Sequence, residues 1–316
     1  MSYLEVISEA IPIILLISLG YYLKSIGFIS HKVVSEMKEL VVNLSLPALL
    51  FLSFLEVNFV PKYLVIILVV LFSNLLMLAI GNGIEKLFDF DDPYFALLFG
   101  GFEVGMLGIP LFGAMYGVDK VKYMGVIDIG QELYVWFILL ALLFKLRGEA
   151  KNIKELSLSF VTSPIIIAIF SGIALNSLGL EKLILYNNQF GNGFLETIKL
   201  ISQITIPVIL MIIGYEMEFN FKNISLPLRI IGIRISILIP LALIINQFIF
   251  TQILDLNLFY KIALLAMFIL PPPFIIPLFI KENERENYTY IYNTLSLGSI
   301  TTLGLFLLIS SIYGIN

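Results

Sequence analysis

The chain consists of apolar runs that are each about long enough to cross a lipid bilayer as a helix. A helix that spans the roughly 30 Å hydrocarbon core needs about 20 mostly apolar residues. Of the 316 residues, 59% are hydrophobic and 13% are charged, whereas soluble domains have roughly 45–50% and about 25%. The sequence therefore predicts an all-α integral membrane protein with ten transmembrane helices. We place them near residues 4–26, 33–56, 62–87, 93–117, 121–146, 158–179, 194–217, 226–251, 257–280 and 286–313.

The scarcity of reactive side chains excludes most enzyme chemistry. The chain has no cysteine and a single histidine, His31, which excludes disulfides, thiolate metal sites and Ser-His or Cys-His catalysis. A phosphate-binding loop of the form GxxxxGK(S/T) is absent. The net charge of −4 is small for this length, and nucleic-acid binding would need a clustered basic face. We expect no enzyme, no resident cofactor and no nucleic-acid partner, with an intramembrane hydrolase that uses paired acids as a remote alternative.

The Lys and Arg residues predict the orientation, because cytoplasmic loops carry an excess of them. If the amino terminus lies outside the cell, 13 of the 19 fall on the cytoplasmic side. These 13 are Lys24, Lys32, Lys38, Lys86, Lys145, Arg147, Lys151, Lys154, Lys222, Arg229, Arg234, Lys281 and Arg285. The other side then holds Lys62, Lys120, Lys122, Lys182, Lys199 and Lys261. We therefore expect a multi-pass protein of the cell membrane with both termini outside.

The two halves of the chain match each other. Helix 1 aligns with helix 6 at a shift of 152 residues, helix 2 with helix 7 at 160, and helix 4 with helix 9 at 167. The matched pairs include Pro12 and Pro164, Gly20 and Gly172, Pro47 and Pro207, Glu56 and Glu216, and the Ile-Pro-Leu-Phe strings at 109–112 and 276–279. Because each copy has five spans, the second copy is inverted in the membrane, as in many secondary transporters. We expect a first repeat over 1–146, a cytoplasmic connecting loop over 147–157 and a second repeat over 158–316.

Helices 4 and 9 carry residues that break helices. Four glycines and one proline lie between Gly100 and Pro110, and helix 9 contains Pro271-Pro272-Pro273 and Pro277. Glycine and proline destabilise a helix interior by about 1 and 3 kcal/mol relative to alanine. Paired interruptions in corresponding spans of two halves indicate a transport site, although kinks used only for packing are the alternative. The predicted substrate-binding residues are Glu103, Val104, Gly105, Gly108, Pro110, Pro271, Pro272, Pro273 and Pro277.

Ionisable residues inside the predicted spans are a second indication of function. Such residues are expensive in a membrane and are functional candidates by default. Glu103 lies in the helix 4 break, and helix 5 carries Asp128, Gln131 and Glu132. Arg234 in helix 8 is the deep basic residue available to pair with these acids. We predict that the five residues couple transport to H⁺ or Na⁺ or support the site, with Asp128 either buried or at the membrane surface.

The chain resembles the auxin efflux carrier family, which contains plant auxin carriers and prokaryotic malate and malonate permeases. The resemblance covers the whole chain and rests on NLSLPALL from Asn43, GMLGIPLFGAMYG from Gly105, Leu270-Pro271 followed by Lys281-Glu282, and Leu146-Arg147-Gly148. It implies a fold similar to bile acid symporters and sodium/proton antiporters, in which helices 4 and 9 are broken and cross. Helices 1, 2, 6 and 7 then form a scaffold that also makes a homodimer. Helices 3–5 and 8–10 form a transport domain that moves as an elevator.

One residue departs from the family pattern. Members place Asn before the crossover in helix 4, to bind a substrate carboxylate, and the corresponding residue here is Glu103. We predict a secondary transporter of a small organic solute, by resemblance an organic acid, with Glu103 as the candidate proton-coupling group. A carrier of a neutral or cationic solute, or an Na⁺- or H⁺-coupled transporter that uses Glu103, Asp128 and Glu132, is the first alternative. A membrane receptor without transport is the second.

Overall fold

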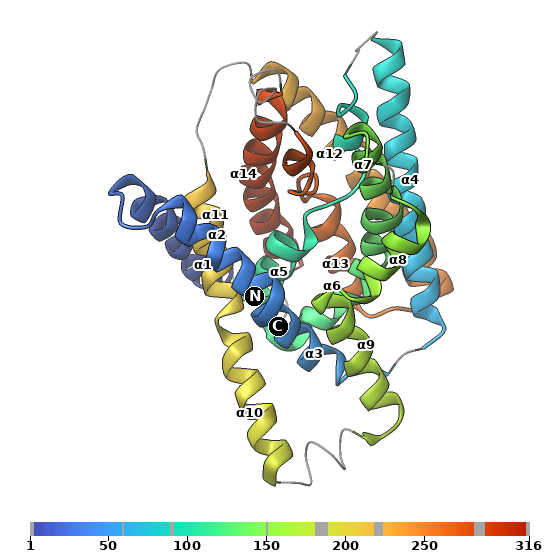
Figure 1. Ribbon diagram of the computed structural model, residues 1–316. Helices are drawn as coiled ribbons and strands as arrows, with labels where there is room; N and C mark the ends of the chain where they lie inside the picture. Colours follow the sequence, from blue (N-terminus) through green and yellow to red (C-terminus); the bar gives the residue numbers. More distant parts are fainter. Residues whose placement is uncertain are drawn as a thin grey trace.

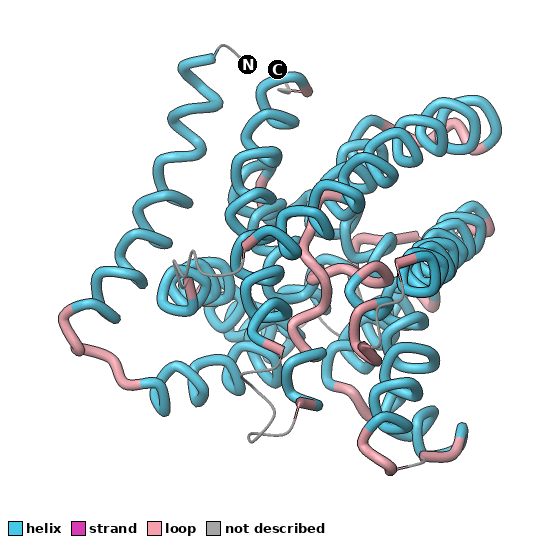
Figure 2. Tube along the Cα trace, turned by 90° about the horizontal axis from the view of Figure 1, so that it is seen from above, coloured by secondary structure: helices cyan, strands magenta, loops and turns pink. Residues whose placement is uncertain are grey.

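The computed structural model describes residues 3–58, 60–88, 92–149, 151–180, 189–217, 224–280 and 288–313, and these contain helices and no strand. Lys182, Lys222, Lys281, Glu282 and Arg285, which enter the sequence analysis, lie outside the described residues. Figure 1 shows the helices as a bundle in which α1 and α11 lie against each other on one flank, with α4 on the other. The start of α1 and the end of α14 lie on the same side (Figure 2).

The described residues of the first half form seven α-helices. In chain order its elements are α1 (Tyr3–Ser25), α2 (His31–Leu40), a π-helical turn (Val41–Ser45), α3 (Leu46–Phe54), α4 (Lys62–Leu87), a 3-10 turn (Ala96–Leu98), a π-helical turn (Val104–Gly108), α5 (Ile109–Tyr116), a 3-10 turn (Val118–Lys120), α6 (Val121–Tyr134), a π-helical segment (Val135–Leu139) and α7 (Leu140–Leu146). The π-helical turns at 41–45 and 104–108 directly precede Pro47 and Pro110. Because proline has no amide to donate, a wider turn before it lets the helix continue.

The described residues of the second half form seven further α-helices. Its elements are α8 (Ile153–Val161), α9 (Pro164–Ser177), α10 (Gln189–Gln203), α11 (Thr205–Glu216), α12 (Ser225–Ile244), a π-helical segment (Ile245–Ile253), α13 (Leu258–Phe268), a 3-10 turn (Ile276–Phe279) and α14 (Thr289–Ile312).

The predicted multi-pass membrane protein is confirmed. Among the described residues, six helical segments are long and apolar enough to span a membrane, and α8 with α9, bent by 62°, makes a seventh if the pair is one span. Three shorter apolar helices, over 10–25, 104–116 and 258–268, occupy the places of the predicted first, fourth and ninth spans. The count of ten stays a prediction.

The connecting loop predicted over 147–157 is shorter in the structure. Helix α8 begins at Ile153, because Asn152 caps it. The Asn152 side chain accepts a hydrogen bond from the Glu155 amide at 3.0 Å, and the Glu155 carboxylate accepts from the Asn152 amide at 3.2 Å. This reciprocal capping box satisfies two amides that a helix start otherwise leaves free.

Two helix pairs approach each other through glycines. On α1, Gly20 lies against the Met211 carbonyl of α11, and Gly214 of α11 lies against the Ile17 carbonyl of α1. On α9, Gly172 lies against the Phe51 carbonyl of α3, 2.9 Å from where a Cβ atom would stand. Small residues allow this close backbone approach, which drives helix association in lipid.

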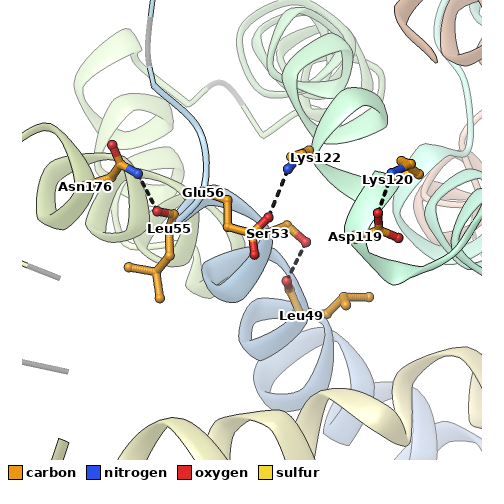
Figure 3. Close-up of polar contacts among 8 residues, drawn as sticks. All are labelled: Leu49, Ser53, Leu55, Glu56, Asp119, Lys120, Lys122 and Asn176. Carbon is orange, nitrogen blue, oxygen red and sulfur yellow. Dashed lines mark hydrogen bonds and ion pairs between the residues drawn. The ribbon is translucent and has the colours of Figure 1, made fainter. Parts of the chain in front are cut away.

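Polar contacts at the end of α3 join three segments (Figure 3). Asn176 of α9 donates to the Leu55 carbonyl, and Lys122 of α6 pairs with Glu56 at 2.9 Å. Within α3, Ser53 bonds the Leu49 carbonyl at 2.8 Å, so its hydroxyl is satisfied inside its own helix. The Glu56 side chain is 58% exposed, so this ion pair contributes little to stability.

The Gly20 contact predicts the effect of adding one methyl group. Gly20→Ala places a carbon against backbone of α11, which cannot rotate away, and we expect a loss of about 1–3 kcal/mol in the free energy of unfolding. Gly83→Ala in α4 is the matched control, because nothing lies within 4 Å of its added Cβ. For Gly83→Ala we expect a gain of about 0.5–1 kcal/mol in the free energy of unfolding. Thermal unfolding of both purified variants measures the difference, and equal melting temperatures would contradict the close approach.

Candidate functional site

Two non-helical segments meet inside the bundle, at a contact that we call the crossing. Residues 99–103 separate the turn at 96–98 from the helix over 104–116, and residues 269–275 separate α13 from the turn at 276–279. The Glu103 amide donates to the Pro271 carbonyl at 3.0 Å, which joins the two segments directly. The Phe102 and Phe268 rings stack with centroids 5.2 Å apart. Both predicted interruptions are therefore present, and they contact each other.

A glycine in the left-handed region makes the first crossing segment possible. Gly101 has φ +85°, a conformation that side chains other than glycine rarely adopt. A Cβ atom there would also stand 2.7 Å from the Pro273 ring. The chain thus needs glycine at 101 for two reasons, the turn and the approach of the proline run.

The Arg234 guanidinium binds the carbonyl oxygens at the crossing. Among the described residues, Arg234 donates to Leu98 and Phe99 at 2.6 Å, to Gly101 at 3.0 Å and to Leu270 at 3.3 Å. These carbonyls lie where two helices end, so they carry partial negative charge and lack an intrahelical donor. The guanidinium also lies over the Phe102 ring, 5.2 Å from its centroid.

The predicted pairing of Arg234 with buried acids is wrong. No ion pair of Arg234 with Glu103, Asp128 or Glu132 is found among the described residues. The physical reason is that interrupted helices expose several carbonyls together, and a planar group with five N–H donors matches such a set better than a single carboxylate does.

Three further side chains satisfy backbone groups of the crossing segments. The Asn74 carbonyl oxygen on α4 accepts from the Gly101 amide at 2.9 Å. The Gln131 amide on α6 donates to the Phe102 carbonyl at 2.8 Å, and the Thr302 hydroxyl on α14 donates to the Ile269 carbonyl at 2.6 Å. Gln131 is a predicted site residue, whereas Asn74 and Thr302 are not. Asn74 and Thr302 are both fully buried. This burial would have marked them as candidates, but it cannot be seen in the sequence alone.

The Glu103 carboxylate receives two backbone amides, one from each interrupted helix. One oxygen accepts from the Met106 amide at 3.1 Å, which makes Glu103 the N-cap of the helix over 104–116. The other oxygen accepts from the Phe274 amide at 2.7 Å. The side chain is half-buried, and the charges of Lys38 and Glu216 act on it through space. An anionic group at the crossing would use these same amides.

The remaining predicted substrate-binding residues divide into two groups. Pro271, Pro272 and Pro273 lie in the second crossing segment and are buried. Val104, Gly105, Gly108, Pro110 and Pro277 lie beyond the segments, the first four in the helix over 104–116 and Pro277 in the 3-10 turn.

The interruption of helix 4 ends at residue 103, several residues before Pro110. The π-helical turn at 104–108 accommodates the missing Pro110 amide, so this proline stays inside a helix. Gly108 nevertheless lies close to the second segment, since a Cβ atom there would stand 2.7 Å from the Leu270 side chain.

Helix α6 carries the other two predicted acids. Asp128 is 2% exposed, so it is buried inside the bundle. Glu132 is half-buried and accepts a hydrogen bond from the Trp136 indole at 2.8 Å. Neither acid has a hydrogen bond to the crossing segments among the described residues, but both interact electrostatically with Glu103.

An apolar bundle in which two interrupted helices meet at a polar centre is typical of one class of protein, the membrane transport proteins. The sequence comparison agrees. The family model for membrane transport proteins, the auxin efflux carrier family, matches residues 5–303, and the chain belongs to this family. No curated protein matches the sequence.

The carbonyl contacts of Arg234 predict a large effect of a conservative change. Arg234→Lys keeps the charge but cannot reach carbonyls in two segments, and a buried unsatisfied group costs about 1–3 kcal/mol. We expect a loss of about 3 kcal/mol in the free energy of unfolding. Arg229→Lys, at an exposed position on the same helix, is the control and should change it by about 0.5 kcal/mol or less. Denaturant unfolding in detergent compares the two, and similar midpoints would refute the role given to Arg234.

Proposed function

We propose that this protein is a secondary transporter that carries a small organic solute across the cell membrane, with the solute bound at the crossing of residues 99–103 and 269–275. The observation that carries this proposal is the Glu103 carboxylate, which accepts amides from both interrupted helices at 3.1 and 2.7 Å. Because Glu103 bonds to both segments at once, a solute that moves the segments apart or together would change the hydrogen bonds of its carboxylate. Family membership supports transport as the activity.

The glycine contacts support the inverted repeat on which alternating access would depend. The predicted shifts of 152 and 160 residues relate Gly20 to Gly172 and Met211 to Phe51. In the structure Gly20 lies against the Met211 carbonyl, and Gly172 lies against the Phe51 carbonyl. The two contacts are therefore equivalent under the repeat, although the helices involved are far apart in sequence.

An elevator movement is the mechanism that we propose from the contacts between scaffold and transport domain. Gly113 of α5 lies against the Ile206 side chain of α11, and Gly105 lies near the Leu46 side chain. Glycines facing aliphatic side chains present a smooth apolar surface that offers no hydrogen bonds to break. The exposed pair of Glu56 and Lys122 links the two parts more weakly than a buried pair would.

Glu103 sets a condition on the charge of the solute. An organic anion at the crossing needs the amides of Met106 and Phe274, and both are bonded to Glu103. An ionised Glu103 would also repel it. We therefore propose that an organic acid binds when Glu103 is protonated, which couples transport to protons.

A neutral or cationic solute is the second candidate. The observation in its favour is that the half-buried Glu103 carboxylate has no ion-pair partner among the described residues. An ionised Glu103 with free coordination on its exposed side would attract an amine instead of releasing its amides.

Solute uptake by the Glu103→Gln variant, compared with the unchanged protein, tests the proposal. In proteoliposomes the unchanged protein should concentrate labelled malate or malonate when the outside is acidic. The variant has no proton to gain or lose at 103, so its uptake should depend much less on the pH gradient. Glu36→Gln, on an exposed residue of α2, is the control and should keep the pH dependence.

Other outcomes separate the alternatives. Uptake of amines that is abolished by Glu103→Gln would select the cationic solute. Saturable binding without flux across a panel of acids and amines would identify a receptor. A variant that keeps the full pH dependence would exclude Glu103 as the coupling group.

A further inference from the structure

Helix α6 carries a row of buried polar side chains spaced three residues apart, Asp128, Gln131 and Tyr134. Their exposed fractions are 2%, 1% and 0%. Each has an oxygen atom without a hydrogen-bond partner among the described residues: Oδ1 of Asp128, Oε1 of Gln131 and the Tyr134 hydroxyl. Residues three apart on a helix lie on neighbouring parts of one face. Buried polar atoms are almost always bonded, so such a row points to an unseen water or ion.

This face of α6 borders the first crossing segment. The Gln131 amide donates to the Phe102 carbonyl at 2.8 Å. The Tyr134 hydroxyl lies against Gly100, and its ring lies against Gly101, 3.2 Å from where a Cβ atom would stand. A side chain at either glycine would collide with Tyr134. The row therefore runs beside the backbone that Arg234 and Glu103 hold.

The charges that act on Asp128 are both negative. They belong to Glu132, one turn along α6, and to Glu103 in the crossing. The other charged or titratable side chains on elements near α6 contact different groups. Lys122 pairs with Glu56, Lys62 bonds the Leu254 carbonyl, Tyr63 and Tyr123 pack against Tyr260, the Tyr116 hydroxyl bonds Ser310, and Arg234 bonds carbonyls.

Asp128 is the one acidic residue that is buried among those described. An ionised carboxylate in a protein interior is very unfavourable unless it is paired or bonded. Asp128 has neither a cation nor a hydrogen-bond donor among the described residues, and its two charged neighbours repel a negative charge. A bound proton removes this conflict without moving any other group.

We propose that Asp128 is a proton-binding site, separate from the Glu103 position, and that water along the row to Gln131 and Tyr134 connects it to the crossing. The proton comes from bulk water, is held on a carboxyl oxygen of Asp128 in this conformation, and returns to water when the row opens. A proton needs one oxygen, whereas a metal ion needs several, and no group of three acid or histidine side chains suited to a metal is found in the described part of the chain. The site itself follows from burial and contacts, while its role in coupling depends on the proposed transport function.

Infrared spectroscopy of the purified full chain tests the site without any solute. At neutral pH the protein should show the carbonyl-stretch band of a protonated carboxylic acid, and this band should be absent from Asp128→Asn. Asp119→Asn, at an exposed aspartate before α6, is the matched control and should keep it. If Asp128→Asn fails to fold, labelling the unchanged protein with ¹³C-carboxyl aspartate should shift the band, and the same label in glutamate should not.

The outcomes distinguish failure of this site from failure of the transport proposal. A band that survives Asp128→Asn, or that shifts only with labelled glutamate, overturns the proton site. So does a band that disappears on adding Na⁺ at constant pH, because the site would then bind a metal cation. A band that behaves as expected in a protein that transports none of the tested solutes upholds the site and refutes the proposed function alone.

Discussion

The structure depends on the contact between one guanidinium and the carbonyls of two interrupted helices. Unwinding a helix inside a membrane removes hydrogen bonds that lipid cannot replace, and each unsatisfied group costs several kcal/mol. An arginine at the same depth is also costly on its own. The two costs offset each other, because the N–H groups of Arg234 bind carbonyls that the unwound helices leave free. These are the carbonyls of Leu98, Phe99, Gly101 and Leu270. Each unfavourable element is stable only because the other is present, so the crossing can exist only with this residue or an equivalent donor.

Backbone amides at the crossing are bound by a charged side chain in the same way. Glu103 accepts the amides of Met106 and Phe274, just as Arg234 donates to carbonyls. Charged side chains of the protein therefore already bind backbone amides and carbonyls at the crossing before a solute arrives. A solute that uses these amides must first displace a side chain, which ties its binding to the protonation of that side chain.

The sequence predicted that helices would break but not where each break begins and ends. The glycine run and the triple proline gave both interruptions, because local backbone chemistry decides them. Pro110 lies outside the interruption, since a π-helical turn before it keeps the helix intact. The partners of Arg234 and the roles of Asn74 and Thr302 could not be predicted, because they depend on residues brought together from distant spans. The burial of Asp128 depends likewise on how α6 packs in the bundle.

The two carboxyl groups are suited to different tasks because their surroundings differ. Glu103 is half-buried and bonded to two amides, which it can give up to a solute when it is protonated. Asp128 is buried with no such donors. Because the charges of the two acids interact, a proton on Asp128 makes a second negative charge at the crossing less unfavourable. By reciprocity, an anion bound there strengthens proton binding at Asp128 by the same free energy. Two acids arranged in this way would link solute and proton binding through electrostatics alone, without direct contact between the two sites.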